Sequence, residues 1–355
     1  MLVWRPIPDL PRRRFVRLRR FANAFSWSRL GALAVLVAAL VWGATRLDWR
    51  LIVQHVTSAS PALLVAAAMA WTFGMFIRPL RMLILTRALL PVPWHHYWTV
   101  WSADMLALAA NSIVPMRAGD ALVPFMLRKA LGTRALRLFP ILLVDRFFDL
   151  VTVSVLFVAT LAAAPTVVPW AESVVFPLLG GLALLVFGLW FVIRKRHLWA
   201  VLLDGLSNHS LRRGEEGLTA KVHDLIAGFA VVDSLRVAAP ALLLSIGVWA
   251  MTSVSYWLGS MAIFPQTPPA AAAFAAAVVA LSFVVPLTPG GVGIFHAAMV
   301  LALSLYGMPA ETALAVAIVI HGVLLCTVFA LAFIAVVAQR IDLRSLAVLR
   351  DRPTR

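Results

Sequence analysis

The sequence has little that would suit a soluble protein or one held together by disulfides. Only 13% of its residues are charged, while 62% are hydrophobic. The single cysteine, Cys326, cannot form an internal disulfide, and its apolar neighbours predict a small buried side chain. The longest polar stretch, Arg194–Arg236, itself contains apolar helical pieces. These scarcities exclude a disulfide scaffold and leave no room for a large soluble domain.

The motifs of several enzyme classes are also missing from the sequence. It contains no phosphate-binding loop, zinc-binding histidine helix, serine elbow or dinucleotide fingerprint. We therefore expect no enzyme, no cofactor, no metal site and no catalytic residue. A membrane-embedded transferase stays open as an alternative, because Asp145 and Asp149 with a histidine could supply acid and base groups.

Long apolar runs are what the sequence does contain. Runs of about 20 residues recur along the whole chain, which is typical of a polytopic α-helical membrane protein. We predict an all-α polytopic membrane protein with about six full spans and two broken re-entrant elements. The predicted spans are Leu30–Leu47, Pro61–Ile77, Leu138–Ala163, Val174–Ile193, Ala239–Phe264 and Glu311–Ala338. A short loop with Asp48, Arg50 and His55 is predicted to follow the first span.

The charge is strongly basic, with 31 Lys and Arg against 15 Asp and Glu. In a membrane chain this excess indicates cytoplasmic segments facing anionic lipid, and no pattern suits nucleic acid. Residues 1–29 are predicted to be a basic cytoplasmic tail before an uncleaved first span, and residues 339–355 a second basic tail. Residues 194–238 are predicted to form a cytoplasmic loop. Both termini then lie on the cytoplasmic side of the inner membrane.

The distribution of arginine also predicts two elements that enter and leave the membrane on one side. If the loops beginning at Arg78 and at Arg128 both lie inside, Thr99–Leu127 must be re-entrant, with its break at residues 115–120. Ala270–Tyr306 is likewise predicted to enter from outside, with its break at residues 286–296. Irregular backbone at membrane depth must be buried in protein or line a wet cavity. The alternative is a Pro/Gly connection at the membrane surface.

The two halves of the chain, residues 30–163 and 174–338, then share one plan in opposite orientation. Asn-Ser-Ile-Val-Pro115 resembles Ser-Phe-Val-Val-Pro286, and the separation from Gly132 to Arg146 equals that from Gly307 to His321. Inverted repeats of this kind place a binding site near the midplane. Chance similarity between apolar sequences is the alternative.

Ionisable side chains inside membrane segments are costly and tend to be functional or paired. Asp145 and Asp149 are predicted to share a helix face, and Arg146 can reach Asp149. This group could dock its span on neighbouring helices or bind a lipid headgroup. The full set of ionisable residues predicted at membrane depth is Asp104, Arg117, Asp120, Asp145, Arg146, Asp149, His296 and His321.

The two breaks carry groups that suit an anion. The guanidinium of Arg117 could hold a phosphate bidentately. Gly290, Gly291 and Gly293 precede a helix whose first N–H groups would be free to bind an anion, although Pro-Gly-Gly is also a plain helix breaker. His296 and His321 are either proton carriers or, more simply, packing residues.

Three motifs in this order resemble one family. They are Asn111-x3-Pro115-x-Arg117-x-Gly119-Asp120, Asp145-Arg146-x2-Asp149 and Pro289-Gly-Gly-Val-Gly293. The chain is similar to the lysylphosphatidylglycerol synthase transmembrane-domain family, whose members are also called flippase-like proteins. The resemblance implies an inner-membrane helical fold and movement of lipids between leaflets. It also implies a stand-alone member, since no soluble aminoacyltransferase domain follows before Arg355.

These observations lead to one principal hypothesis. The protein is an inner-membrane flippase or transporter for an anionic phospholipid or a lipid-linked, polyisoprenoid molecule. An accessory subunit of a lipid-modifying enzyme is the second hypothesis, and the protein partner is unknown. The predicted substrate path comprises Asn111, Pro115, Arg117, Gly119, Asp120, Asp145, Arg146, Asp149, Pro289, Gly290, Gly291, Gly293, His296 and His321.

Overall fold

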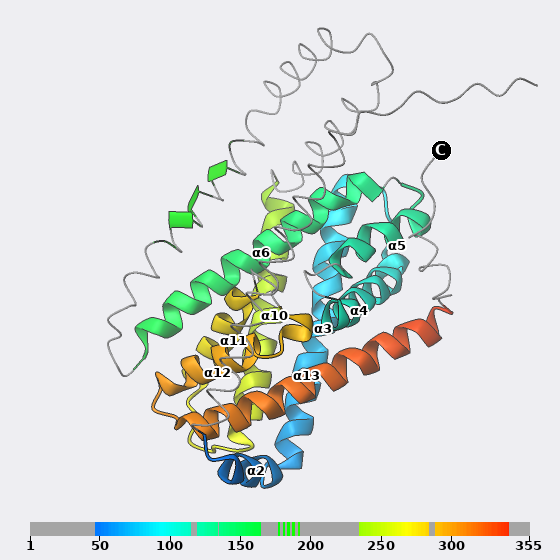
Figure 1. The fold of residues 1–355 in the computed structure, drawn as a ribbon. Helices are drawn as coiled ribbons and strands as arrows, with labels where there is room; N and C mark the ends of the chain where they lie inside the picture. Colours follow the sequence, from blue (N-terminus) through cyan, green and yellow to red (C-terminus); the bar gives the residue numbers. More distant parts are fainter. Residues whose placement is uncertain are drawn as a thin grey trace, which may run out of the picture. The chain divides into compact units, whose positions relative to one another are not determined.

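The computed structural model describes residues 47–114, 119–133, 135–164, 234–283 and 288–340, with scattered residues between 177 and 191. The chain divides into two compact units, Met1–Trp49 and Arg50–Arg355, and nearly all described residues belong to the second. Every regular element within these ranges is a helix (Figure 1). The basic tails, the span Leu30–Leu47, most of Val174–Ile193 and the loop at 194–233 lie outside the described residues.

Helix α3, Pro61–Leu89, is much longer than the sequence predicted. The predicted end at Ile77 and the basic loop starting at Arg78 are wrong, because the helix continues through Pro79 with Arg78 and Arg81 buried. Its 29 residues extend about 43 Å. A hydropathy profile ends a membrane span where two arginines occur, because it assumes that they face water. In this protein both arginines form ion pairs in the interior. The predicted membrane topology rested in part on a basic cytoplasmic loop at Arg78, and this loop does not exist.

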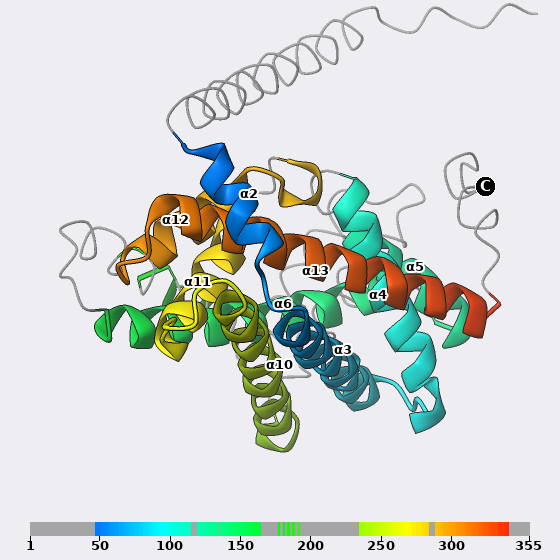
Figure 2. The same cartoon turned by 90° about the horizontal axis from the view of Figure 1, so that it is seen from below.

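Three further long helices complete the frame: α6 (Ala135–Ala162), α10 (Leu235–Met261) and α13 (Ala310–Ala338). Helices α3 and α10 pack along each other, and α13 crosses them (Figure 2). Among the described residues, α3, α10 and α13 are long and apolar enough to cross a membrane. The predicted spans Ala239–Phe264 and Glu311–Ala338 are therefore confirmed as helices to within a few residues. Helix α6 covers the predicted Leu138–Ala163 but carries more charge.

The first predicted re-entrant element consists of short helices. The 3-10 turn η1 (Trp94–His96) leads into α4 (Tyr97–Ile113), and α5 (Leu122–Ala130) packs against α4. Each of α4 and α5 is shorter than the ~20 residues that a membrane span needs. Residues 115–118 of the break lie outside the described residues. Gly119 fits closely against α4, where an added methyl group would lie 2.3 Å from the carbonyl oxygen of Ala107.

The second predicted re-entrant element has the same form. Helix α11 (Pro269–Ser282) packs against α12 (Ile294–Ser304), with the 3-10 turn η4 (Pro289–Gly291) before α12. Both helices are again too short to span. Gly290, Gly291 and Gly293 have φ of 59°, 72° and 87°, a region that residues with a side chain rarely adopt. The glycines therefore allow the chain to reverse between α11 and α12.

The turn of the second break contacts the end of the helix that leads into the first break. Turn η4 packs on α4, and a methyl group added to Gly290 would lie 2.9 Å from the carbonyl oxygen of Ser112. Two stretches that are far apart in the sequence thus meet where each helix pair is interrupted. That the halves are inverted repeats stays a prediction.

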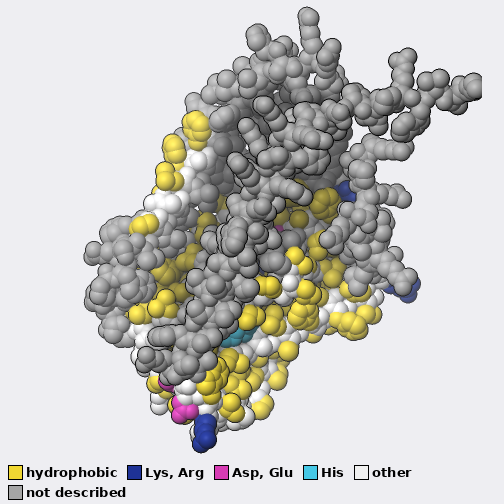
Figure 3. Space-filling model, viewed as in Figure 1, with side chains coloured by type: hydrophobic (Ala, Val, Ile, Leu, Met, Phe, Trp, Pro, Cys, Tyr) yellow, Lys and Arg dark blue, Asp and Glu magenta, His cyan; other side chains and the backbone are white. Residues whose placement is uncertain are grey.

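The outer surface of the described helices suits lipid. On the face shown in Figure 3, the described side chains are mainly hydrophobic. Large apolar side chains are exposed on α3 (Val65, Met69) and on α13 (Phe333), as expected where hydrocarbon replaces water as the solvent.

Two smaller predictions are wrong. Cys326 is exposed on α13, because an apolar neighbourhood in a membrane protein can face lipid as well as the core. The segment with Asp48, Arg50 and His55 was expected to be a loop, but Trp49–Thr57 forms the helix α2. The side chain of Ile52 is buried, and packing of such an apolar face stabilises a short helix.

The contact between the breaks gives the first testable prediction. Gly290→Ala should destabilise the protein more than Gly132→Ala. Both glycines have nearly the same φ, 59° and 60°, so each alanine pays about 1–2 kcal/mol for left-handed backbone. A methyl group at Gly132 meets no atom within 4 Å, whereas overpacking at Gly290 should add about 1–3 kcal/mol. Thermal unfolding in detergent, followed by tryptophan fluorescence, measures the difference. Equal unfolding midpoints for the two variants would show that Gly290 does not pack against the end of α4.

Candidate functional site

Arg81 is the centre of a buried ion-pair cluster. Its Nε lies 2.7 Å from Asp145 Oδ1, and its Nη1 lies 2.7 Å from Asp149 Oδ1. Nη1 also donates to the hydroxyl of Ser245. The Arg81 side chain is 0% exposed. One guanidinium therefore connects α3, α6 and α10 in the interior.

Helical spacing explains this arrangement. Asp145 and Asp149 lie four residues apart, so one helix face presents both carboxylates, as the sequence predicted. Arg78 and Arg81 were not among the residues predicted at membrane depth. The missed signal is the apolar run after them: Met82, Leu83 and Leu85 are buried, which indicates a helix that continues rather than a loop.

Arg146 forms the second part of the cluster. Its Nη1 lies 3.4 Å from Asp149 Oδ2, which confirms the predicted contact between these two residues. Its Nη2 lies 3.2 Å from Asp120 Oδ1, which also accepts a hydrogen bond from Asn111 Nδ2 at 2.8 Å. Residues that flank the first break are thus attached to α6.

Two further contacts extend the cluster to the neighbouring helices. Arg78 Nη2 lies 3.3 Å from Asp104 Oδ1, which connects α3 with α4. Trp249 Nε1 donates to Asp149 Oδ1 at 3.2 Å, which adds α10. Buried charges are costly unless they are paired and hydrogen-bonded. These contacts pair the three arginines of the cluster with its four aspartates inside an apolar protein.

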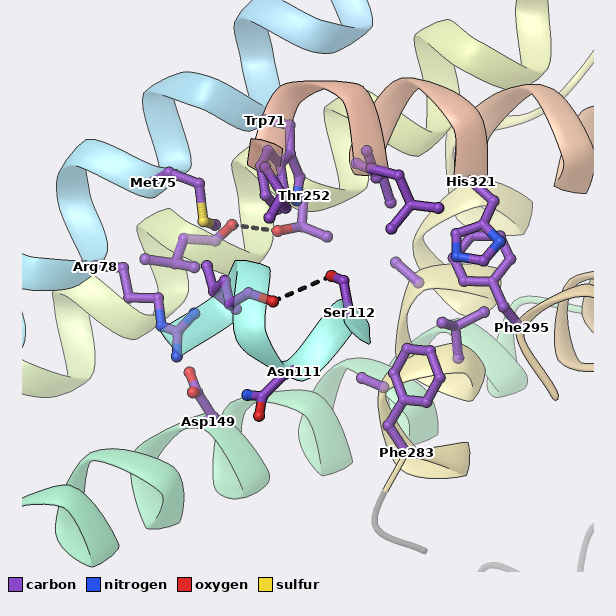
Figure 4. Close-up of a pocket in the computed structure, with 18 of the residues that line it drawn as sticks. Trp71, Met75, Arg78, Asn111, Ser112, Asp149, Thr252, Phe283, Phe295 and His321 are labelled. Atoms are coloured by element: carbon purple, nitrogen blue, oxygen red, sulfur yellow. Dashed lines mark hydrogen bonds between the residues drawn. The ribbon is translucent and has the colours of Figure 1, made fainter. Parts of the chain in front are cut away.

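A cavity of about 240 Å³ opens beside the cluster, bounded by both breaks and by α3, α6, α10 and α13. Figure 4 shows Arg78, Asn111 and Asp149 on one side of it and Phe283, Phe295 and His321 on the other. The cavity is therefore amphipathic. Its charged and polar lining consists of Arg78, Asn111, Ser112, Asp120, Arg146, Asp149, Thr252 and His321, and its aromatic lining of Trp71, Trp249, Tyr256, Phe283 and Phe295.

The histidines stabilise the second break. His321 Nε2 lies 3.0 Å from the carbonyl oxygen of Gly290, and its ring stacks on Phe295 with centroids 4.4 Å apart. His296 Nδ1 accepts a hydrogen bond from the backbone N–H of Gly293 at 3.3 Å. The N–H of Gly291 is also used, by the carbonyl oxygen of Thr288 at 3.2 Å. Two glycine N–H groups of this break are thus bonded within the chain, while the anion site predicted at the first N–H groups of α12 stays a prediction.

The predicted site residues divide into three groups. Those that line the cavity are Asn111, Asp120, Arg146, Asp149, Gly290 and His321. Those that lie around it without lining it are Gly119, Asp145, Pro289, Gly291, Gly293 and His296. Pro115 and Arg117 lie outside the described residues. The lining residues that were not predicted include Arg78, Trp249 and Tyr256.

Among the described residues, no group of three or more His, Cys, Asp or Glu is arranged to hold a metal ion.

These features define a class: a helical membrane protein with an ion-paired cavity between two broken helical elements. The family model described as Lysylphosphatidylglycerol synthase TM region matches residues 29–332. The chain belongs to this family, as its motifs indicated, and its function is therefore connected with membrane lipids. Neither a search of curated proteins nor a search of solved structures finds a match.

The ion-pair cluster gives the second testable prediction. Arg81→Gln should destabilise the protein by about 3–5 kcal/mol, because it removes the cation nearest to both Asp145 and Asp149. The matched change Arg128→Gln, at an exposed position of α5, should stay within about 0.5 kcal/mol of the wild type. Denaturant unfolding of the purified protein in detergent measures both. Similar stabilities of the two variants would contradict the central role of Arg81.

Proposed function

We propose that the protein moves a lipid with an anionic headgroup, either a phospholipid or a polyprenyl phosphate, between the leaflets of the inner membrane. The observation that carries this proposal is the amphipathic cavity at the meeting point of the two breaks. Family membership supports a lipid as the substrate class.

The chemistry of the cavity fits a phosphate-bearing headgroup. Arg78 and Arg146 both line it, and guanidinium groups bind phosphate oxygens by charge-assisted, often bidentate hydrogen bonds. Arg117 joins them in this proposal through its place in the first motif. Asp120 and Asp149 hold the Arg146 guanidinium in position, so the headgroup meets a pre-arranged donor.

The size of the cavity indicates how a lipid would bind. Pockets for drug-sized ligands measure about 300–1,000 Å³, and this cavity of about 240 Å³ is smaller. It suits a headgroup and not a whole lipid. The acyl or prenyl chains would remain in the bilayer, against the apolar outer surface, while the headgroup crosses between the breaks.

Inverted halves and a cytoplasmic position of both termini belong to the same proposal. In such an arrangement the two broken elements approach the midplane from opposite sides. The contact of Gly290 with Ser112 supports this, since it brings the two interruptions together.

A transport assay in proteoliposomes tests the proposal. We expect the purified protein to move labelled phosphatidylglycerol or a polyprenyl phosphate between leaflets. Aminoacylated phosphatidylglycerol, whose headgroup carries an ammonium beside the phosphate, is screened alongside them. Thr252→Phe should slow this at least about tenfold, equivalent to ~1.4 kcal/mol in the barrier, because Thr252 lines the cavity. Ala250→Phe, at an exposed position on the same helix, is the matched control and should leave the rate unchanged.

Three outcomes would argue against transport. Folded wild-type protein that moves none of these lipids would favour the accessory-subunit hypothesis, and co-purification would then identify the enzyme that it assists. Formation of a modified lipid without a partner would favour a membrane-embedded transferase. If both phenylalanine variants slowed transport equally, the cavity would not be part of the transport path.

A further inference from the structure

Asp104, on α4, is the least satisfied carboxylate in the described part of the cluster. Its side chain is 7% exposed, and its contact with Arg78 joins Oδ1 to Nη2 at 3.3 Å. Its other oxygen, Oδ2, is buried and has no hydrogen-bond partner. A buried charged oxygen without a partner is costly. Protonation of the carboxylate would remove this cost.

The charged groups around Asp104 do not supply the missing partner. Arg146 is near enough to attract it, but the contacts of Arg146 are with the other carboxylates. Asp145 and Asp120 disfavour a further negative charge in their vicinity. Three of the elements packed against α4 are α3, η1 and α5, and a fourth is α13. The other described charged or histidine side chains on them are Arg81, Arg87, His95, His96, Arg128, Glu311 and His321, and none of these forms an ion pair or hydrogen bond with Asp104.

Arg78 connects Asp104 with the cavity. Arg81 and Arg146 each contact at least two carboxylates, whereas Asp104 is the one carboxylate paired with Arg78 among the described residues. Arg78 lines the cavity and Asp104 does not. Arg78 therefore contacts the carboxylate and also borders the space proposed for the headgroup.

We propose that Asp104 is a proton-binding site that controls whether Arg78 is available to the headgroup. A proton added to the Asp104 carboxylate gives a neutral carboxylic acid and ends its ion pair with Arg78. Arg78 keeps its charge and turns to the headgroup phosphate. One proton and one negative charge enter the site together, so its net charge is unchanged. This inference rests on the proposed function, because it assigns a coupled proton to the same lipid site.

Infrared difference spectroscopy tests the proton site without any lipid. The wild-type protein, shifted stepwise from alkaline to acidic buffer, should develop a carboxylic acid C=O band above about pH 5, before exposed carboxylates protonate. The band should be absent from Asp104→Asn and present in Glu311→Gln, which removes a carboxylate at the start of α13. Carbon-13-labelled aspartate in the wild type should shift the band, which assigns it to an aspartate. If Asp104→Asn does not fold, a band that the label does not shift would still overturn the proposal. A band that survives Asp104→Asn, or no band at all, would overturn the proposal.

Binding of short-chain phosphatidylglycerol tests the coupling. Wild-type affinity should fall as the pH rises, by at most about tenfold per pH unit for one linked proton. Asp104→Asn imitates the protonated form, so its affinity should not depend on pH, whereas Glu311→Gln should behave like the wild type. Wild-type affinity that is constant with pH would overturn the coupling. If the wild type binds no lipid at any pH, the proposed function fails, while the infrared band still decides whether Asp104 binds a proton.

Discussion

The pairing of Arg81 with Asp145 and Asp149 is the interaction on which the rest of the structure depends. Three long helices meet at this guanidinium, which is completely buried. In a membrane protein the apolar surface of a helix can face lipid as well as another helix, so apolar burial specifies helix pairing less strongly than in water. A buried charge is different, because it is tolerated only beside its partner. The ion pairs thus specify which faces of α3, α6 and α10 point inward.

The cavity follows from this arrangement. Two helix pairs too short to span the membrane are packed against the frame, and the turn of the second pair at Gly290 meets the end of α4 at Ser112. Polar backbone and charged side chains are thereby collected in one place and separated from the apolar outer surface. Lipid headgroups and lipid chains require these two environments. The ion pairs that stabilise the fold also position Arg146 on the cavity wall, so stability and the proposed binding of a headgroup depend on the same residues.

Much of the helical frame could be predicted from the sequence, because long apolar runs specify α10 and α13 almost completely. The shared face of Asp145 and Asp149 followed from helical spacing, and three short motifs identified the family. Arg78 and Arg81 could not be placed in the same way. A hydropathy profile considers each side chain alone. Whether an arginine can lie within a membrane span depends on whether a neighbouring helix supplies a carboxylate to pair with it. The aromatic lining of the cavity could not be predicted for a similar reason. Trp249 and Tyr256 look like any aromatic residues of a membrane span until the packing of α10 against α11 is known.

The central claim is that the cavity between the breaks holds a lipid headgroup, and a structure of the protein in nanodiscs with native lipids tests it most directly. The account predicts density for a headgroup inside the cavity, with its phosphate within hydrogen-bond distance of Arg78 or Arg146 and its chains leading out to the bilayer. A well-resolved map in which lipids lie only against the outer surface, with the cavity closed by side chains, would contradict it.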